Sequence, residues 1–173
     1  MSHAAGSMPR SVVIGVGNPV LTDDGAGIRA AELLRRVIEP GEPVDVIDVW
    51  AGGLRLMEAM VGYERAVVID AMVSGRVEPG TVVELEVADL PATRNLNCLH
   101  DTNLPVALEL GREAGVQLPA TIRIFGIEAL DVSTFSERLT EPVEAGLPGL
   151  MGRVMDALRR DAGGHREDRP VLL

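Results

Sequence analysis

Short runs rich in valine and isoleucine alternate along this chain with longer segments whose apolar residues follow helical spacing, and this alternation limits the possible folds most. The runs predict strands at residues 11–16, 44–49, 66–70, 81–87 and 120–127. The segments between them predict helices at residues 25–38, 53–61, 103–114 and 140–161, the last interrupted or restarted at Pro148. Residues 66–70 are apolar on both faces, as in a central parallel strand, whereas residues 81–87 alternate as in a half-exposed edge strand. We therefore expect an α/β fold, a three-layer α/β/α sandwich around a five-stranded, mostly parallel twisted sheet with one antiparallel edge strand.

The composition excludes several functional classes. The 173 residues carry 16 Lys and Arg against 26 Asp and Glu, a formal net charge of −10 with histidine neutral. This charge argues against nucleic-acid binding, which depends on clustered Lys and Arg, and the few aromatic side chains offer no base-stacking platform. One cysteine excludes a disulfide scaffold and a cysteine-rich metal site. We expect a partner that is neutral, cationic or a protein.

Both ends of the chain are expected to be flexible. Residues 1–10 form a polar leader or tag remnant, residues 11–161 a single domain, and residues 162–173 a glycine-rich, charged tail. The leader lacks the hydrophobic region of a secretory signal, and no apolar run approaches the roughly 20 residues of a membrane helix. We therefore expect a cytoplasmic monomer with no membrane partner.

The sequence GVGNPVLTDDGAG at residues 15–27 is the densest candidate for a functional loop. Val20 stands where a dinucleotide fingerprint needs its third glycine, and the Lys-Ser/Thr pair of a phosphate-binding loop is absent. The loop instead presents Asp23 and Asp24 just past the first predicted strand. For Asp23 we expect the structural role of a helix cap, which is common for Asp. A second acid exceeds what a cap needs, so Asp24 is the functional candidate.

Asp70 and His100 are the other candidate site residues. Asp70 ends the third predicted strand, and it meets Asp24 above one crevice if the first and third strands are neighbours where the strand order reverses. His100 is the only histidine outside the terminal segments. Two carboxylates and one imidazole form an open ligand set for a borderline divalent ion, and a neutral imidazole also allows general-base chemistry. Taken singly, Asp70 could merely start a turn and His100 could bond to loop backbone.

Cys98 and the start of the third helix need separate consideration. Cys98 lies two residues before His100, but no third residue that would orient a Cys–His nucleophile is evident. A small, half-buried side chain is the preferred interpretation of Cys98, and a role as an additional soft ligand is secondary. We expect Asp101 or Thr102 to cap the helix that follows.

At these residues the sequence resembles the [NiFe]-hydrogenase maturation proteases, a family of nickel-dependent endopeptidases that process a C-terminus. The loop at 15–27 is one matching element, and the strand and turn VVIDAMVSGRVEPG at 67–80 is another. LHDTNLPVALELG at 99–111 and IFGIEALDVSTFSERLTEPVEAGLPGL at 124–150 complete the set. The four elements span nearly the whole predicted domain, in the family's order and at its spacing.

The resemblance implies that Asp24, Asp70 and His100 are metal ligands and carry the catalysis. It implies an endopeptidase that removes the C-terminal extension of a hydrogenase large-subunit precursor after nickel insertion. The nickel would be carried by the substrate and bound transiently, because three ligands are too few to hold it tightly. Two alternatives stay open: a self-sufficient metallohydrolase of a small substrate, and a nickel-checking chaperone that binds the precursor without cutting it.

Overall fold

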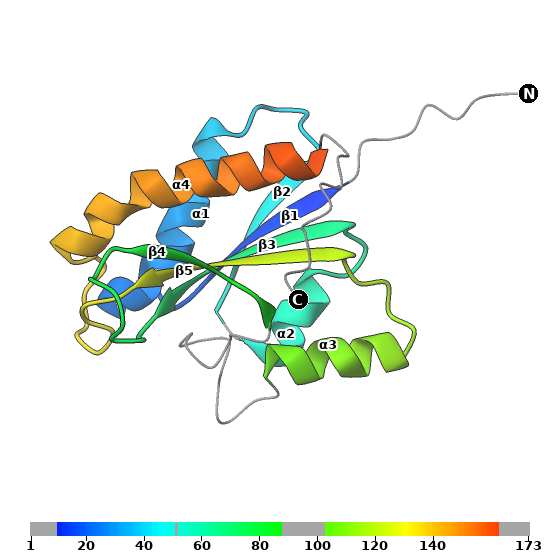
Figure 1. Cartoon of the computed structure of the whole chain (residues 1–173), viewed down its shortest axis with the longest axis horizontal. Helices are drawn as coiled ribbons and strands as arrows, with labels where there is room; N and C mark the ends of the chain where they lie inside the picture. Colours follow the sequence, from blue (N-terminus) through cyan, green and yellow to red (C-terminus); the bar gives the residue numbers. More distant parts are fainter. Residues whose placement is uncertain (1–9, 51, 88–102, 163–173) are drawn as a thin grey trace, which may run out of the picture.

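The computed structural model describes residues 10–50, 52–87 and 103–162, which form one open sheet with helices on both faces (Figure 1). The strand order is β2-β1-β3-β5-β4, in which the first four strands are parallel and β4 pairs antiparallel with β5. The strands are β1 (Ser11–Val16), β2 (Val44–Val49), β3 (Arg65–Met72), β4 (Val82–Leu85) and β5 (Thr121–Glu128). The predicted fold class and the antiparallel edge strand are confirmed.

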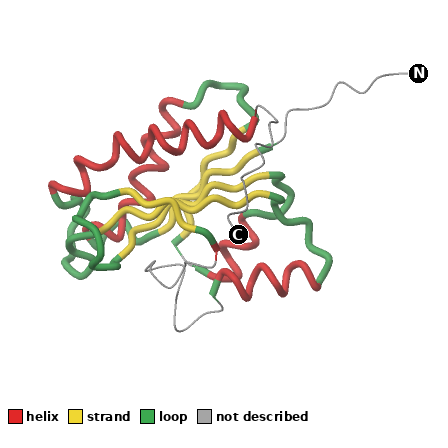
Figure 2. Tube along the Cα trace, in the orientation of Figure 1, coloured by secondary structure: helices red, strands yellow, loops and turns green. Residues whose placement is uncertain are grey.

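The helices form the two outer layers of the sandwich (Figure 2). They are α1 (Ala26–Val37), α2 (Gly53–Ala59), α3 (Leu104–Glu113) and α4 (Glu141–Ala162), with a short 3-10 helix η1 (Thr22–Gly25) before α1. Helices α1 and α4 cover one face of the sheet, and α2 and α3 cover the other (Figure 1).

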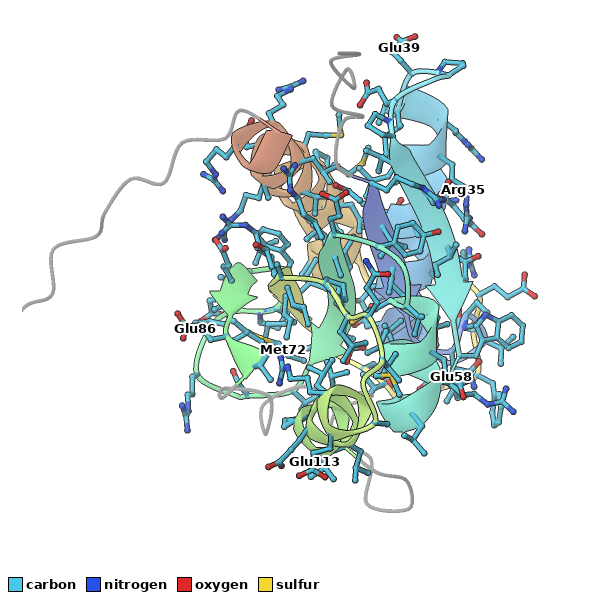
Figure 3. All side chains as sticks on the ribbon, turned by 90° about the vertical axis from the view of Figure 1, so that its right-hand side faces the viewer. Arg35, Glu39, Glu58, Met72, Glu86 and Glu113 are labelled. Carbon is cyan, nitrogen blue, oxygen red and sulfur yellow. The ribbon has the colours of Figure 1, made fainter. Side chains whose placement is uncertain are left out.

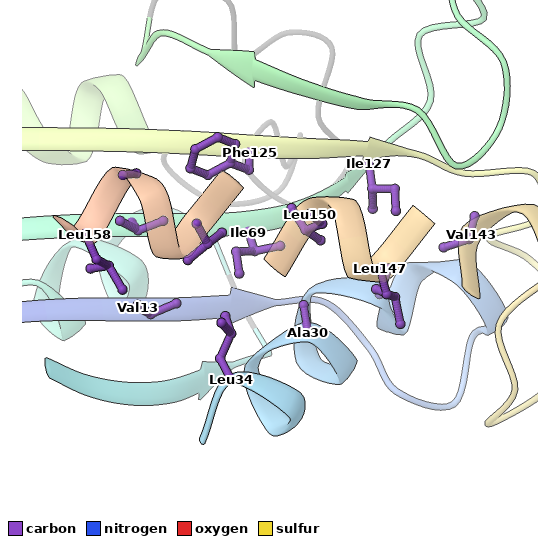
Figure 4. Close-up of a cluster of buried hydrophobic side chains, with 14 residues drawn as sticks. Val13, Ala30, Leu34, Ile69, Phe125, Ile127, Val143, Leu147, Leu150 and Leu158 are labelled. Atoms are coloured by element: carbon purple, nitrogen blue, oxygen red, sulfur yellow. The ribbon is translucent and has the colours of Figure 1, made fainter. Parts of the chain in front are cut away.

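The alternation of side chains along each strand divides the apolar core between the two faces. In β1, Val12 and Ile14 pack toward α2 and α3, while Val13 packs toward α1 and α4. On the α1 and α4 side, Phe125 and Leu150 belong to a cluster of aliphatic side chains that fills the space between α4 and the sheet (Figure 4). Aliphatic residues therefore supply nearly all of the buried apolar surface, which is the main stabilising contribution to the fold.

Two expectations about the helices are wrong. Helix α4 continues through Pro148 without interruption. Pro148 lies on the exposed side of the helix, while Leu147 and Leu150 belong to a continuous buried stripe whose packing offsets the cost of about 3 kcal/mol for an interior proline. The cap of α3 is Asn103, whose Oδ1 accepts a hydrogen bond from Val106 N at 3.1 Å, rather than Asp101 or Thr102.

Within the described ranges, no helix is both long and apolar enough to cross a membrane.

Candidate active site

The sheet reverses its strand order between β1 and β3. After β1 the chain passes through α1 to β2 on one side of β1, and β3 then pairs with the other side. Because β1 and β3 are parallel, the segments that follow them leave from the same edge of the sheet. Ligands of open α/β sheets bind outside this edge, at the reversal. The condition on which the meeting of Asp24 and Asp70 depended, that the first and third strands are neighbours, is therefore met.

Four acidic side chains in the described part of the chain are buried, and all four lie at this carboxyl edge. They are Asp23 and Asp24 in η1, Asp70 near the end of β3, and Glu128 at the end of β5, each no more than 2% exposed. A buried carboxylate is costly unless donors or cations compensate its charge. Their concentration at one edge therefore separates them from the acids of the surface.

The glycines of the first loop allow η1 and α1 to approach the strand ends closely. A Cβ atom at Gly27 would overlap the carbonyl oxygens of both Val16 and Ile69, which belong to β1 and β3. Gly17 has a φ of +144°, and a Cβ there would overlap the carbonyl oxygen of Asp24. These two glycines thus allow close packing of η1 and α1 against backbone.

This close approach brings the turn that carries Asp24 to the end of the strand that carries Asp70. Helix η1 contacts β3, and the start of α1 lies against the carbonyl of Ile69, one residue before Asp70. Asp24 Oδ2 accepts a hydrogen bond from Asn18 N at 3.0 Å, which fixes the carboxylate within the loop. Asp70 lies on the same face of the sheet as Val68, the face covered by α2 and α3. Asp24 and Asp70 therefore lie on elements in direct contact.

Asp23 does not cap a helix, and that expectation is wrong. The N-cap residues of η1 and α1 make no side-chain capping bond. Instead, Asp23 Oδ2 accepts hydrogen bonds from Leu130 N at 2.9 Å and Asp131 N at 3.0 Å. Asp23 Oδ1 accepts from Thr140 N at 2.7 Å, and the Thr140 hydroxyl donates to the same carboxylate. The role is structural, as expected, but it links η1 to a distant loop.

Further bonds hold the loop at residues 130–140 against η1. Thr22 Oγ1 donates to the carbonyl oxygen of Thr134 at 2.6 Å, and Thr22 N donates to that of Ser136 at 2.9 Å. Thr22 adopts a φ of +47°, a strained value for a β-branched residue that these contacts impose. Hydrogen bonds from Thr134 and from the backbone of Ser133 hold the pKa of Asp131 well below its ordinary value of 3.8. The turn carrying Asp24 is therefore fixed from both sides.

Glu128 is a buried acid to which sequence reasoning assigned no role. Its Oε1 accepts hydrogen bonds from Gly75 N at 2.7 Å and Ser74 N at 2.9 Å, and its Oε2 accepts from Ser74 Oγ at 2.7 Å. These bonds fix the segment that follows β3, and hence the surroundings of Asp70. An acid at the end of a Val- and Ile-rich run was an available signal, but the predicted strand ended one residue earlier.

The other predicted residues cannot be located. His100 and Cys98 lie outside the described residues, as do Asp101 and Thr102. Among the residues that are described, no three His, Cys, Asp or Glu side chains gather as a set of metal ligands. The structure thus brings the elements of Asp24 and Asp70 together and leaves the third predicted ligand untested.

Comparisons with known proteins give a consistent family. The family model described as HycI, hydrogenase maturation protease, matches residues 28–157. The hydrogenase 2 maturation protease of Escherichia coli (strain K12) is 32% identical over 154 residues, which cover 87% of this chain and 91% of that protein. The hydrogenase expression/formation protein HupD of Rhizobium leguminosarum bv. viciae is 29% identical over 153 residues, 87% of this chain and 75% of that one.

Solved structures agree with the sequence relatives. The hydrogenase maturating endopeptidase HybD from E. coli superimposes with a TM-score of 0.75 at 29% identity, covering 87% of this chain and 93% of that chain. A hydrogenase 2 maturation peptidase from Thaumarchaeota archaeon SCGC_AB-539-E09 gives a TM-score of 0.62, also at 29% identity, over 86% and 97% of the two chains. Since the family model covers most of the domain and the fold agrees, the chain belongs to the hydrogenase maturation protease family and is a peptide hydrolase.

Proposed function

We propose that this protein removes the C-terminal extension of a [NiFe]-hydrogenase large-subunit precursor after nickel insertion, and that it recognises the nickel through Asp24, Asp70 and His100. In this proposal the nickel belongs to the substrate, and the protein is a cytoplasmic monomer that binds it only during processing. The observation that carries the proposal is the pair of buried carboxylates, Asp24 and Asp70, on contacting elements at the β1–β3 reversal.

The chemistry of the three side chains fits this task. Carboxylate oxygens and an imidazole nitrogen are suitable ligands for a borderline divalent ion such as nickel. Burial strengthens the attraction between Asp24 and Asp70 and an incoming cation, because little water screens the charges. His100 precedes the first residue of α3 by four positions in the sequence, and α3 covers the face of the sheet to which Asp70 belongs.

Three protein ligands leave coordination positions of the ion open. A scissile carbonyl or a water molecule at such a position would gain Lewis-acid activation for amide hydrolysis. The tasks of the protein are then to hold the precursor at its metal and to present the peptide bond there. Asn18 N holds Asp24 in position, and the bonds to Glu128 hold the segment after Asp70.

The test is incubation of the purified protein with nickel-loaded and nickel-free precursor, followed by measurement of the large-subunit mass. We expect the nickel-loaded precursor to be shortened and the nickel-free precursor to remain intact. The variants Asp24→Asn, Asp70→Asn and His100→Ala should lose cleavage while their far-UV circular dichroism is unchanged. The control Asp156→Asn removes a solvent-exposed carboxylate of α4 and should cleave like the wild type.

Three results would contradict the proposal. Equal cleavage of nickel-free precursor would refute recognition of the metal. Precursor binding without any shortened product, unaffected by Asp24→Asn, would indicate a chaperone. Stoichiometric metal in the purified protein, together with activity on short peptides, would indicate a self-sufficient metallohydrolase.

A further inference from the structure

A groove of about 1090 Å³ lies beside the turn that carries Asp24. Its walls are the loop after β1, the exposed side of α1, Trp50 after β2, and the start of α4 with the segment before it. Thr22 and Gly25, the two ends of η1, also line it, so the groove borders the turn that carries Asp24. Its volume is slightly above the range of about 300–1,000 Å³ typical of small-molecule pockets. It therefore offers space for several residues of a peptide.

One end of the groove carries the only tryptophan of the chain. Trp50 is 73% exposed, and Val20 and Ile28 contribute further apolar surface to the same groove. Tryptophan is strongly enriched among the residues that dominate binding energy at interfaces. Trp50 therefore provides an anchor point for an apolar side chain of a bound segment.

The opposite wall carries uncompensated negative charge. Glu137, Glu141 and Glu144 line it, and none of them forms an ion pair with any described residue. Glu141 and Glu144 lie in the first turn of α4, where negative charge also stabilises the helix, but Glu137 precedes the helix and has no such role. With Arg138 as the one cation on this wall, the charge is complementary to a basic segment.

We propose that this groove binds the C-terminal extension of the precursor as an extended, basic segment with an apolar side chain packed against Trp50. The inference rests on the proposed function, because it names the part of the substrate that leaves the cleavage site. Because Thr22 and Gly25 line the groove on either side of Asp24 in the sequence, a chain bound next to Asp24 has only the η1 turn to cross to reach the groove. The extension thus contributes affinity through the groove, while the nickel-binding residues carry the chemistry.

The first experiment separates binding from chemistry through the kinetics of nickel-loaded precursor. Trp50→Ser and Glu137→Lys should each raise KM about tenfold, as expected for loss of an interface anchor or reversal of a complementary charge, and leave kcat within twofold. Each variant has a matched control. Phe135→Ser removes an aromatic side chain that is 83% exposed but does not line the groove. Glu113→Lys reverses an exposed charge at the end of α3 (Figure 3), a helix that covers the other face of the sheet from α1 and α4, which line the groove.

The second experiment measures binding without cleavage. Because Trp50 is the only tryptophan, its fluorescence reports directly on a synthetic peptide with the sequence of the extension. We expect the emission to shift to shorter wavelength as the peptide binds, and the peptide affinity to fall about tenfold in Glu137→Lys. The affinity should also fall as salt is added, since the groove charges are exposed.

The results distinguish failure of the inference from failure of the proposed function. Normal cleavage with KM unchanged in both groove variants, as in the controls, would overturn the inference and leave the proposed function standing. The groove variants should bind the processed subunit, which lacks the extension, as tightly as the wild type does. If they lost as much affinity for the processed subunit as for the precursor, the groove would bind another part of the partner and the inference would be overturned. If the wild type cleaved no precursor, the proposed function would fail. Independently of cleavage, a Trp50 emission that does not change when the peptide is added would refute binding of the extension in the groove.

Discussion

Replacement of Asp23 by asparagine should destabilise the protein far more than its conservative size suggests. Both oxygens of the Asp23 carboxylate accept hydrogen bonds from backbone N–H groups: Oδ1 from Thr140, and Oδ2 from Leu130 and Asp131. An asparagine side chain keeps one oxygen and places an NH₂ group at the other position. Whichever way the amide is oriented, a donor then faces at least one buried backbone donor.

The magnitude follows from the bonds that are lost. Orientation of the amide nitrogen toward Thr140 N strands one donor that was bonded at 2.7 Å, and the opposite orientation strands two. A buried, unsatisfied donor costs about 1–3 kcal/mol, and the remaining bonds weaken by about 1 kcal/mol without the negative charge. We therefore expect Asp23→Asn to lower the free energy of unfolding by about 2–4 kcal/mol, a large part of the roughly 5–15 kcal/mol of a typical domain.

Glu128→Gln is the matched control, because Glu128 is equally buried at the same edge of the sheet. Its Oε1 accepts both backbone N–H groups, while the 2.7 Å bond to its Oε2 comes from the Ser74 hydroxyl. A glutamine can keep its oxygen toward the backbone and donate its NH₂ to the hydroxyl oxygen of Ser74, so no backbone donor is stranded and only the rotatable hydroxyl loses its acceptor. We expect a loss of about 1 kcal/mol or less.

The assay is equilibrium unfolding in urea at neutral pH, followed by far-UV circular dichroism, with the slope m compared among all three proteins. The reasoning predicts a lower midpoint for Asp23→Asn at constant m and a midpoint for Glu128→Gln close to that of the wild type. Losses for the two variants that agree within about 0.5 kcal/mol would refute the claim that the identity of the donors, rather than burial alone, decides the cost.

Three further predictions concern other parts of the structure. Burial and the 2.7 Å hydrogen bond to Asp45 raise the pKa of Tyr63, the only tyrosine, above its ordinary value of 10.0. Its absorbance at 295 nm should therefore titrate with a midpoint above pH 10.0, and this midpoint should move closer to pH 10.0 in Asp45→Asn. A wild-type midpoint at or below pH 10.0 would contradict this. Gly27→Ala should lower the free energy of unfolding by about 1–3 kcal/mol and impair precursor cleavage, because the added Cβ overlaps the carbonyl oxygens at the ends of β1 and β3. A variant with the wild-type melting temperature would contradict this close approach of α1 to the strands. Because the pKa of Asp131 is lowered in the folded protein, its ionised carboxylate stabilises the fold above the ordinary pKa of 3.8, and this stabilisation is lost as the pH falls through the folded pKa. The difference in free energy of unfolding between wild type and Asp131→Asn should therefore be larger at pH 6 than at pH 2. A difference that does not depend on pH would contradict this.

The strands were predictable because each leaves a local signal: β1 and β3 are apolar on both faces, and the half-buried β2 is rich in valine and isoleucine. Residues 11–16 and 44–49 have the bounds of β1 and β2, and the third strand extends beyond the predicted 66–70 by a few residues. The proximity of the elements carrying Asp24 and Asp70 followed from topology alone, since parallel neighbours release their loops at one edge. Both signals are present in the sequence without knowledge of distant contacts.

The failed predictions depend on such distant contacts. The donors to Asp23 lie 107, 108 and 117 residues further along the chain, so nothing near Asp23 distinguishes this role from a helix cap. Likewise, Pro148 carries a strong local signal to end a helix, which packing of α4 on the sheet overrides. A local rule predicts an acid in the right place, but the partners of that acid are decided by the tertiary fold.

The buried acids divide into two that hold loops and two to which the proposed function assigns chemistry. Asp23 and Glu128 accept hydrogen bonds from two different loops at the carboxyl edge of the sheet, Asp23 from the segment after β5 and Glu128 from the segment after β3. Their charges are compensated by backbone donors, and the result is two fixed loops. Asp24 and Asp70 lie next to these loops on contacting elements, so in the proposed function the two structural acids provide the rigid frame for the pair that recognises the metal. It follows that loosening this frame through Asp23→Asn should impair cleavage of nickel-loaded precursor even at temperatures where the variant stays folded.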